Sequence, residues 1–147
     1  MPTYTVKYSN FNLTKQKKNK IAKGITLVHE KVTGAKSFFA QVIFVENKKN
    51  YHFMGGKSVK KKQLFLNGQI RAGRSEEIKD KLIKKLRDTL IQNSGLSRDK
   101  IWVYIVDLPP AQMIEYGEIL PQSGKEIDWF NNLPKKLKKK LIELDNW

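Results

Sequence analysis

VIFVE at residues 42–46 recurs as VYIVD at residues 103–107, and the shift of 61 residues between them runs through much of the chain. The same shift aligns four further pairs of residues: Thr14 with Ser75, Ile21 with Leu82, Ile25 with Leu86 and Gly34 with Gly95. Self-similarity at one fixed offset is the signature of a repeated structural unit. The chain is therefore a tandem duplication.

The first half has the pattern of a strand, a helix and a strand. Residues 3–8 alternate between polar and apolar side chains, which predicts a strand. Thr14 is placed to cap a helix, and Gly34 is placed to end it in the left-handed conformation. The buried stripe of this helix consists of Ile21, Ile25, Val28 and Val32. The run at residues 38–45 is β-branched and aromatic, which is typical of a central strand.

The second half repeats this order. Residues 63–66 predict a strand, and residues 101–106 predict the strand that closes the unit. Between them, Ser75 is the expected helix cap and Gly95 the expected stop. Glu76 and Glu77 fall in the first turn, and the stripe consists of Ile78, Leu82, Leu86 and Leu90. YHFMGG, at residues 51–56, predicts a short hairpin between the halves.

These patterns predict an α+β fold in one domain, residues 1–147. Two βαβ units, at residues 2–47 and 62–107, would share a four-stranded sheet with both helices on one face. The other face would be bare, so we expect subunits to associate through their sheets.

A tail at residues 108–147 follows the second unit. We expect a short helix at residues 111–116 and, later in the tail, the aromatic pair Trp129 and Phe130. The last 13 residues, KKLKKKLIELDNW, predict an exposed helix or a frayed end.

Composition excludes several classes of protein. The chain has no cysteine and two histidines, so a thiol nucleophile, a disulfide and a thiolate metal site are impossible and no metal is expected. No apolar stretch approaches the ~18 residues of a membrane span. Residues 1–10 lack the layout of a secretory signal. We therefore expect a cytoplasmic protein that does not enter a membrane.

The formal net charge of +15 suggests a polyanion such as nucleic acid as a partner. The basic residues, however, are 25 Lys and only 4 Arg, spread over several predicted elements. No nucleic-acid-binding motif accompanies them, so solvated helix faces are the favoured interpretation. A polyanion-binding or nucleic-acid-binding module remains the alternative function, and a positive field would also attract small carboxylates.

Pro2 is the first residue that points to chemistry. Loss of Met1 would leave a free secondary amine at the start of a strand, and an α-amine titrates near ~8. Such a group can act as an acid or as a base. The alternative is a proline that simply begins a strand, which is structurally ordinary.

Arg71 and Arg74 stand out in a chain that otherwise prefers lysine. They lie in QIRAGRSEE, between a predicted strand and a helix that begins after Ser75. Guanidinium groups bind carboxylates through two hydrogen bonds, and a helix start adds amide donors. The segment predicts an anion site, although two surface arginines paired with Glu76 or Glu77 would have the same sequence.

Three more residues are weak candidates individually. His29 lies on the first predicted helix, one turn after Ile25, where a packed or solvated side chain is the ordinary interpretation. Tyr104 lies in the last predicted strand of the repeat and is by default a core residue, and Glu115 in AQMIEYGEILP is by default a surface acid.

Taken together, these residues resemble those of the cis-3-chloroacrylic acid dehalogenase group of the tautomerase superfamily, over residues 2–133. The resemblance is carried by these segments: Pro2 at the start, LVHEKVTG with His29, FLNGQIRAGRS with Arg71 and Arg74, IWVY with Tyr104, AQMIEYGEILPQSG with Glu115, and DWFNNLP. It implies tandem βαβ units in a homotrimer. The chain departs from the group at Ala35, where a second hydroxyl residue is expected, at Lys36, and at Phe39, where leucine is expected.

The resemblance implies a cofactor-free enzyme that acts on small α,β-unsaturated carboxylates. Arg71, Arg74 and His29 would bind the carboxylate, and Glu115, assisted by Tyr104, would activate water for attack at C3. Cationic Pro2 would then protonate C2. Alternatively, neutral Pro2 would act as the base of a tautomerase.

Overall fold

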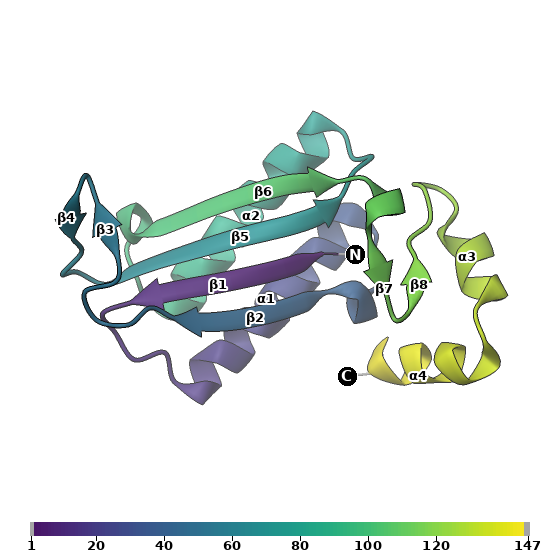
Figure 1. Ribbon diagram of the computed structural model, residues 1–147, viewed down its shortest axis with the longest axis horizontal. Coiled ribbons are helices and arrows are strands. Elements are labelled where there is room, and N and C mark those ends of the chain that lie inside the picture. The colour runs from purple at the N-terminus through teal and green to yellow at the C-terminus, as the bar shows by residue number, and fades with distance from the viewer. Residues whose placement is uncertain (1, 146–147) are drawn as a thin grey trace.

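The computed structural model describes residues 2–145, and its centre is one four-stranded sheet in the order β2–β1–β5–β6 (Figure 1). The strands are β1 (Thr3–Ser9), β2 (Gln41–Glu46), β5 (Gln63–Arg71) and β6 (Ile101–Leu108). β1 runs parallel to β2 and β5 runs parallel to β6, whereas β1 and β5 pair antiparallel. The predicted α+β fold, with two βαβ units that share one sheet, is confirmed.

The prediction that residues 38–45 form a central strand is wrong. Residues Ser37–Phe39 form a short 3-10 helix, η1, and β2 begins only at Gln41, at the edge of the sheet. The apolar residues of this run that misled the prediction include Ile43 and Val45, which lie on the face that no helix covers. Because that face is apolar too, an edge strand here has the composition of a central strand.

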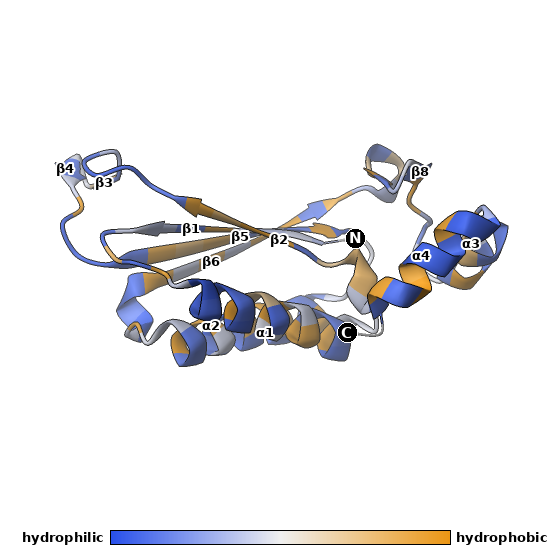
Figure 2. Ribbon diagram, turned by 90° about the horizontal axis from the view of Figure 1, so that it is seen from below, coloured by the Kyte–Doolittle hydropathy of each residue, from blue (hydrophilic) through white to orange (hydrophobic). Residues whose placement is uncertain are grey.

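Two helices of 19 residues each cover the same face of the sheet (Figure 2). In α1 (Lys15–Thr33), the side chain of Thr14 accepts a hydrogen bond from the Lys17 amide, and Gly34 ends the helix with φ 71°. In α2 (Glu76–Ser94), Ser75 accepts from the Ile78 amide, and Gly95 ends the helix with φ 77°. The predicted caps and stops are therefore confirmed.

The core lies between these helices and the sheet. Side chains from β1 and β5, including Tyr4, Val6, Leu64 and Leu66, pack there against the predicted helix stripes, except Ile78, which is half-buried and lies outside this cluster. The opposite face carries a row of exposed apolar side chains, which we call the open face: Ile43, Val45, Trp102, Tyr104 and Val106. The single chain thus has the expected bare face of the sheet, and this face is apolar.

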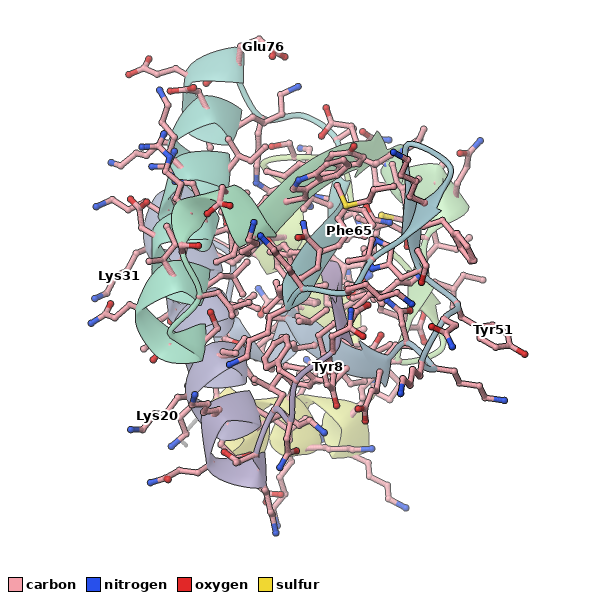
Figure 3. The ribbon with its side chains drawn as sticks, turned by 90° about the vertical axis from the view of Figure 1, so that its left-hand side faces the viewer. Tyr8, Lys20, Lys31, Tyr51, Phe65 and Glu76 are labelled. Carbon is pink, nitrogen blue, oxygen red and sulfur yellow. The ribbon has the colours of Figure 1, made fainter. Side chains whose placement is uncertain are left out.

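The lysines belong to several elements of the fold. They lie along both long helices, in the segment before β5 and along the last helix. Lys20 and Lys31 project from α1 away from the sheet (Figure 3).

Two small hairpins lie at opposite ends of the sheet (Figure 1). The hairpin predicted at residues 51–56 is confirmed, with β3 (Phe53–Met54) and β4 (Lys57–Ser58). The helix predicted at residues 111–116 is wrong, because after η3 (Pro110–Gln112) the chain forms a hairpin of β7 (Ile114–Glu115) and β8 (Glu118–Ile119). Tyr116 and Gly117 adopt φ 56° and 85°, a left-handed turn that a helix cannot contain.

The tail ends in two further helices, α3 (Glu126–Asn132) and α4 (Lys135–Asp145). Outside the tail, one more short 3-10 helix, η2 (Arg98–Lys100), precedes β6. α4 packs against η1, with Leu141 fully buried and Asp145 accepting a hydrogen bond from Ser37. The predicted terminal helix is therefore present and docked rather than frayed, while residues 146 and 147 lie outside the described part of the chain. Within residues 2–145, no helix combines the length and the apolar character that crossing a bilayer requires.

Gly68 is needed for close packing at the centre of the sheet. It lies opposite Tyr4 in the β1–β5 register, and a Cβ at this position would lie 2.6 Å from Cε1 of the Tyr4 ring. We predict that Gly68→Ala lowers the free energy of unfolding by about 1–3 kcal/mol, because the buried ring has no room to move aside. Chemical denaturation measures this loss, and an unchanged midpoint would show that the sheet adjusts at no cost.

Candidate active site

The β1–β5 pairing brings the start of the chain and the arginine segment to the same end of the sheet. Thr3 pairs with Gln69, so Pro2 lies near Arg71, the last residue of β5. Pro2 is buried, and its carbonyl accepts a hydrogen bond of 3.0 Å from the amide of Gln41. The predicted removal of Met1 concerns a residue outside the described part of the chain.

Arg71 is held by the tail of the chain. Its side chain is only 4% exposed, and Nη1 donates to the carbonyl of Pro121 at 2.9 Å while Nη2 donates to the carboxylate of Glu126. Arg74 in turn donates from Nη1 to the carbonyl of Arg71 at 2.6 Å. The alternative in which Arg71 pairs with Glu76 or Glu77 is therefore wrong.

The loop that carries the arginines fits closely under the tail. Gly73 has φ 111°, and a Cβ at this position would lie 3.1 Å from Cβ of Ser123. A larger residue at Gly73 would be strained by its backbone and would push against the tail. Glycine here lets residues 121–126 lie over the arginine segment.

His29 is buried beneath this segment. Its side chain is 1% exposed, and Nδ1 lies 2.7 Å from the hydroxyl of Tyr4. Burial, and then the charge of Arg74, lower the pKa of His29 to about 3. His29 is thus a neutral imidazole at neutral pH.

Three buried side-chain nitrogens at this end of the sheet have no hydrogen-bond partner among the described residues: Nε2 of His29, Nε of Arg71 and Nε of Arg74. Burial, and then the charge of Arg71, lower the pKa of the Arg74 guanidinium, so two cations already lie side by side in a poorly solvated place. Leaving a buried guanidinium N–H unpaired costs free energy, and an anion is a group that can accept from it. The arrangement fits a carboxylate.

Glu115 lies beside the start of β1. It is half-buried in β7 and lines a cavity of about 500 Å³ together with Thr3, Phe38, Phe39 and Gln41. Burial, and then the charge of Glu115, raise the pKa of Tyr116, whose hydroxyl donates to the carbonyl of Phe38 at 2.5 Å. The tail hairpin thus places a carboxylate in a cavity at the same end of the sheet as Pro2.

Within a single chain, Tyr104 does not lie at the end of the sheet where Pro2 and Arg71 lie. It lies on the open face of β6, 53% exposed, and pairs with Asn67, which in turn pairs with Thr5. Its ring contacts Phe65 edge-on with centroids 4.9 Å apart. Tyr104 lines a different cavity, of about 370 Å³, near the hairpin of β3 and β4.

Of the residues that depart from the resembled group, Phe39 lines the cavity with Glu115, and Lys36 lines a different one. The amide of Ala35 donates to the Thr33 hydroxyl at 3.2 Å, so the turn after Gly34 closes without a second hydroxyl residue. Phe39 is buried against Trp129 of α3, with ring centroids 5.6 Å apart. Phe39 therefore lines the cavity and supports the tail.

Sequence reasoning missed two residues of this site, Tyr4 and Glu126. Tyr4 looks like any apolar member of an alternating strand, and Glu126 lies 55 residues from Arg71 in the sequence. Within residues 2–145, no three His, Asp or Glu side chains gather as a metal site would require.

The sequence matches a family described as putative oxalocrotonate tautomerase enzymes over residues 1–132. The chain belongs to this tautomerase family. No curated protein matches the sequence. Among solved structures, the tautomerase chain resembles N1, a member of the cis-3-chloroacrylic acid dehalogenase family, with 27% identity and a TM-score of 0.91 over 96% of this chain and 99% of that one.

Two other structures share the tautomerase fold but not the full length. Native Ps01740 is 25% identical with a TM-score of 0.72, over 77% of this chain and 99% of that chain. A fused 4-OT, solved as a symmetric trimer, is 20% identical with a TM-score of 0.72, over 80% of this chain and 94% of that chain. The N1 structure therefore matches more of this tautomerase chain than either of these two does.

The ion pair between Arg71 and Glu126 makes stability depend on pH. Burial alone would raise the pKa of Glu126, but the hydrogen bond and charge of Arg71 outweigh it and hold that pKa below its usual value of 4.5. A carboxyl group with a lowered pKa in the folded state stabilises it above the unfolded pKa, and this contribution is lost as the pH falls through the folded pKa. We predict that Glu126→Gln lowers the unfolding free energy by about 1 kcal/mol at pH 7. The loss is modest because more than one-third of the Glu126 side chain is exposed and water screens the ion pair.

The difference between the wild type and Glu126→Gln should shrink below about pH 4.5 and vanish at lower pH. Urea denaturation at a series of pH values measures it. Asp128→Asn is the matched control, since Asp128 is an exposed acid in the first turn of the same helix. An equal, pH-independent loss in both variants would contradict the ion-pair interpretation.

Proposed function

We propose that this tautomerase-family protein is a cofactor-independent hydratase or dehalogenase, or a tautomerase, that acts on small α,β-unsaturated carboxylates with its amino-terminal proline. The observation that carries the proposal is the set of three unpaired buried nitrogens on His29, Arg71 and Arg74. They lie at the end of the sheet where Pro2 begins β1 and where Glu115 lines a cavity. The likeness to N1, a member of the dehalogenase family, supports the choice of substrate class.

In this proposal the arginines bind the substrate carboxylate and polarise the double bond. Arg71 already uses Nη1 and Nη2 within the chain, so its Nε, together with Nε of Arg74, is available to the substrate. Donors that are already in place need no reorganisation when negative charge moves toward the carboxylate in the transition state. Glu126 and Pro121 keep the Arg71 guanidinium in this orientation.

Water addition then requires one base and one acid. The Glu115 carboxylate takes a proton from water as the water oxygen bonds to C3, and the Pro2 ammonium gives a proton to C2. With a halogen on C3, the adduct loses halide and a proton and becomes an aldehyde acid. With an acetylenic acid, the enol that forms becomes a keto acid.

The tautomerase form of the proposal uses the same groups differently. Neutral Pro2 removes a proton from a dienol and returns it at another carbon, so no water is added and Glu115 has no water to activate. The two forms therefore differ in what they require of Glu115.

We further propose a homotrimer, in which the open face is buried between copies. The apolar side chains of that face would otherwise remain in contact with water. The fused 4-OT with the same fold is a trimer, which supports this assembly. Because Tyr104 lies on the open face, we assign any assistance that it gives Glu115 to a neighbouring copy.

The chain start provides the test of this function. We predict that protein beginning at Pro2 converts at least one acid from a panel of three-carbon and four-carbon halogenated, acetylenic and enolic acids, as followed by NMR. Protein shown by mass spectrometry to retain Met1 should fold normally but be inactive. Acylated proline nitrogen is an amide with neither a proton to donate nor a basic lone pair.

Two outcomes would contradict the proposal. Full activity in the form that retains Met1 would remove Pro2 from the mechanism. No turnover of any acid by the form that begins at Pro2 would remove the substrate class.

Glu115→Gln distinguishes hydration from tautomerisation. We predict that it abolishes water addition, because only that reaction needs a base on water, and that it leaves most enol-to-keto conversion intact. Parallel NMR assays with an acetylenic acid and an enol measure the two rates. An equal loss of both rates would mean that Glu115 supports the structure of the site rather than the water.

A further inference from the structure

We propose that Tyr4 is a positioning residue whose hydroxyl donates to Nδ1 of His29, keeps the ring proton on Nε2 and so makes His29 a neutral hydrogen-bond donor to the bound carboxylate. The part about the carboxylate rests on the proposed function. The part about the ring proton stands on the geometry of two buried side chains.

The two side chains share one hydrogen bond, of 2.7 Å, and there are two ways to arrange its proton. If the Tyr4 hydroxyl donates, Nδ1 accepts and Nε2 carries the ring proton. If Nδ1 donates instead, the Tyr4 O–H must find another acceptor, but Tyr4 is 0% exposed and no other acceptor for it lies among the described residues. The first arrangement leaves every group of Tyr4 satisfied.

Protonation states agree with this choice. Burial raises the pKa of the Tyr4 hydroxyl well above its usual value, so Tyr4 keeps its proton. Burial, and then Arg74, lower the pKa of His29, so the imidazole has one proton to place. At Tyr4 the charge of Arg74 opposes the effect of burial, but burial is the larger cause, so the pair is a neutral phenol bonded to a neutral imidazole.

A neutral donor suits this position because cations already surround it. The charge of Arg74 acts to lower the pKa of both Tyr4 and His29, and the charge of Arg71 in turn acts on Arg74. An imidazolium would add a third positive charge to a buried place and would raise the cost of desolvation. With its proton on Nε2, His29 adds a donor to the anion site and no charge.

The packing around Tyr4 leaves its hydroxyl little freedom. Its ring lies over Gly68, where even a Cβ would come within 2.6 Å of the ring, and meets the His29 ring edge-on with centroids 5.7 Å apart. A hydroxyl fixed in this way also fixes the orientation of the imidazole. Tyr4 therefore controls where Nε2 points as well as which nitrogen bears the proton.

Nitrogen-15 NMR of the two histidines tests the proton position without any substrate. The chain has only His29 and His52, and a His52→Gln variant assigns them. We expect His29 of the wild type to be the Nε2–H tautomer from pH 5 to 8, with no titration. Tyr4→Phe keeps the ring over Gly68 but removes the hydroxyl, and should give a mixture of tautomers.

Tyr8→Phe is the matched control. Tyr8 lies on the same strand and faces the same core, but at the other end of β1 from Tyr4. Its hydroxyl donates to the carboxylate of Glu46 in β2 at 3.5 Å. It should leave the His29 spectrum unchanged. A wild-type Nδ1–H tautomer, or a single Nε2–H tautomer that survives in Tyr4→Phe, would overturn the proposal.

Kinetics tests whether Tyr4 acts through His29. With an acid that the wild type converts, Tyr4→Phe should lower kcat/KM at least tenfold, and in a His29→Ala background it should change kcat/KM less than twofold. Full activity in Tyr4→Phe, or equal losses in both backgrounds, would refute the positioning role. If the wild type converts no acid at all, the proposed function fails, while the NMR spectra still decide the tautomer.

Discussion

The antiparallel pairing of β1 with β5 is the contact on which the rest of the molecule depends. Each half of the duplication makes a parallel pair of strands, and this pairing joins the two pairs into one sheet. Its register places Thr3 against Gln69, which brings the first described residue of the chain to the end of the strand that carries Arg71. A shift of register by one residue would turn Tyr4 out of the core and away from His29. Fold and site thus share a single determinant.

The tail acts on the site from outside the repeat. It supplies the carboxylate of Glu126 and the carbonyl of Pro121 to Arg71, and it places Glu115 in the cavity. A buried guanidinium with no partner would be costly, so the tail lowers the cost of keeping a cation where the repeat alone would leave it unpaired.

Much of this could be predicted from sequence, because the decisive signals are local. Thr14 and Gly34 mark the ends of a helix through the backbone conformations that they favour, and the repeat supplied the same marks again. The structure of the tail was harder to predict, because Tyr116 adopts a left-handed conformation that no simple sequence pattern indicates. Glu126 and Tyr4 were missed because each acquires its meaning from a distant partner. A single sequence carries no record of such pairs.

The duplication does not duplicate the amino-terminal amine. A fused repeat copies strands and helices, but it cannot copy a chain terminus, because the second unit begins at a strand that is joined by a peptide bond to the residue before it. The position that corresponds to His29 in the second half is Leu90, which is fully buried in the core. The sheet is therefore nearly symmetric in architecture, whereas the proposed chemistry lies on one side of it. Under the proposed mechanism, the stoichiometry is one catalytic centre for each chain, half of what the number of βαβ units would suggest.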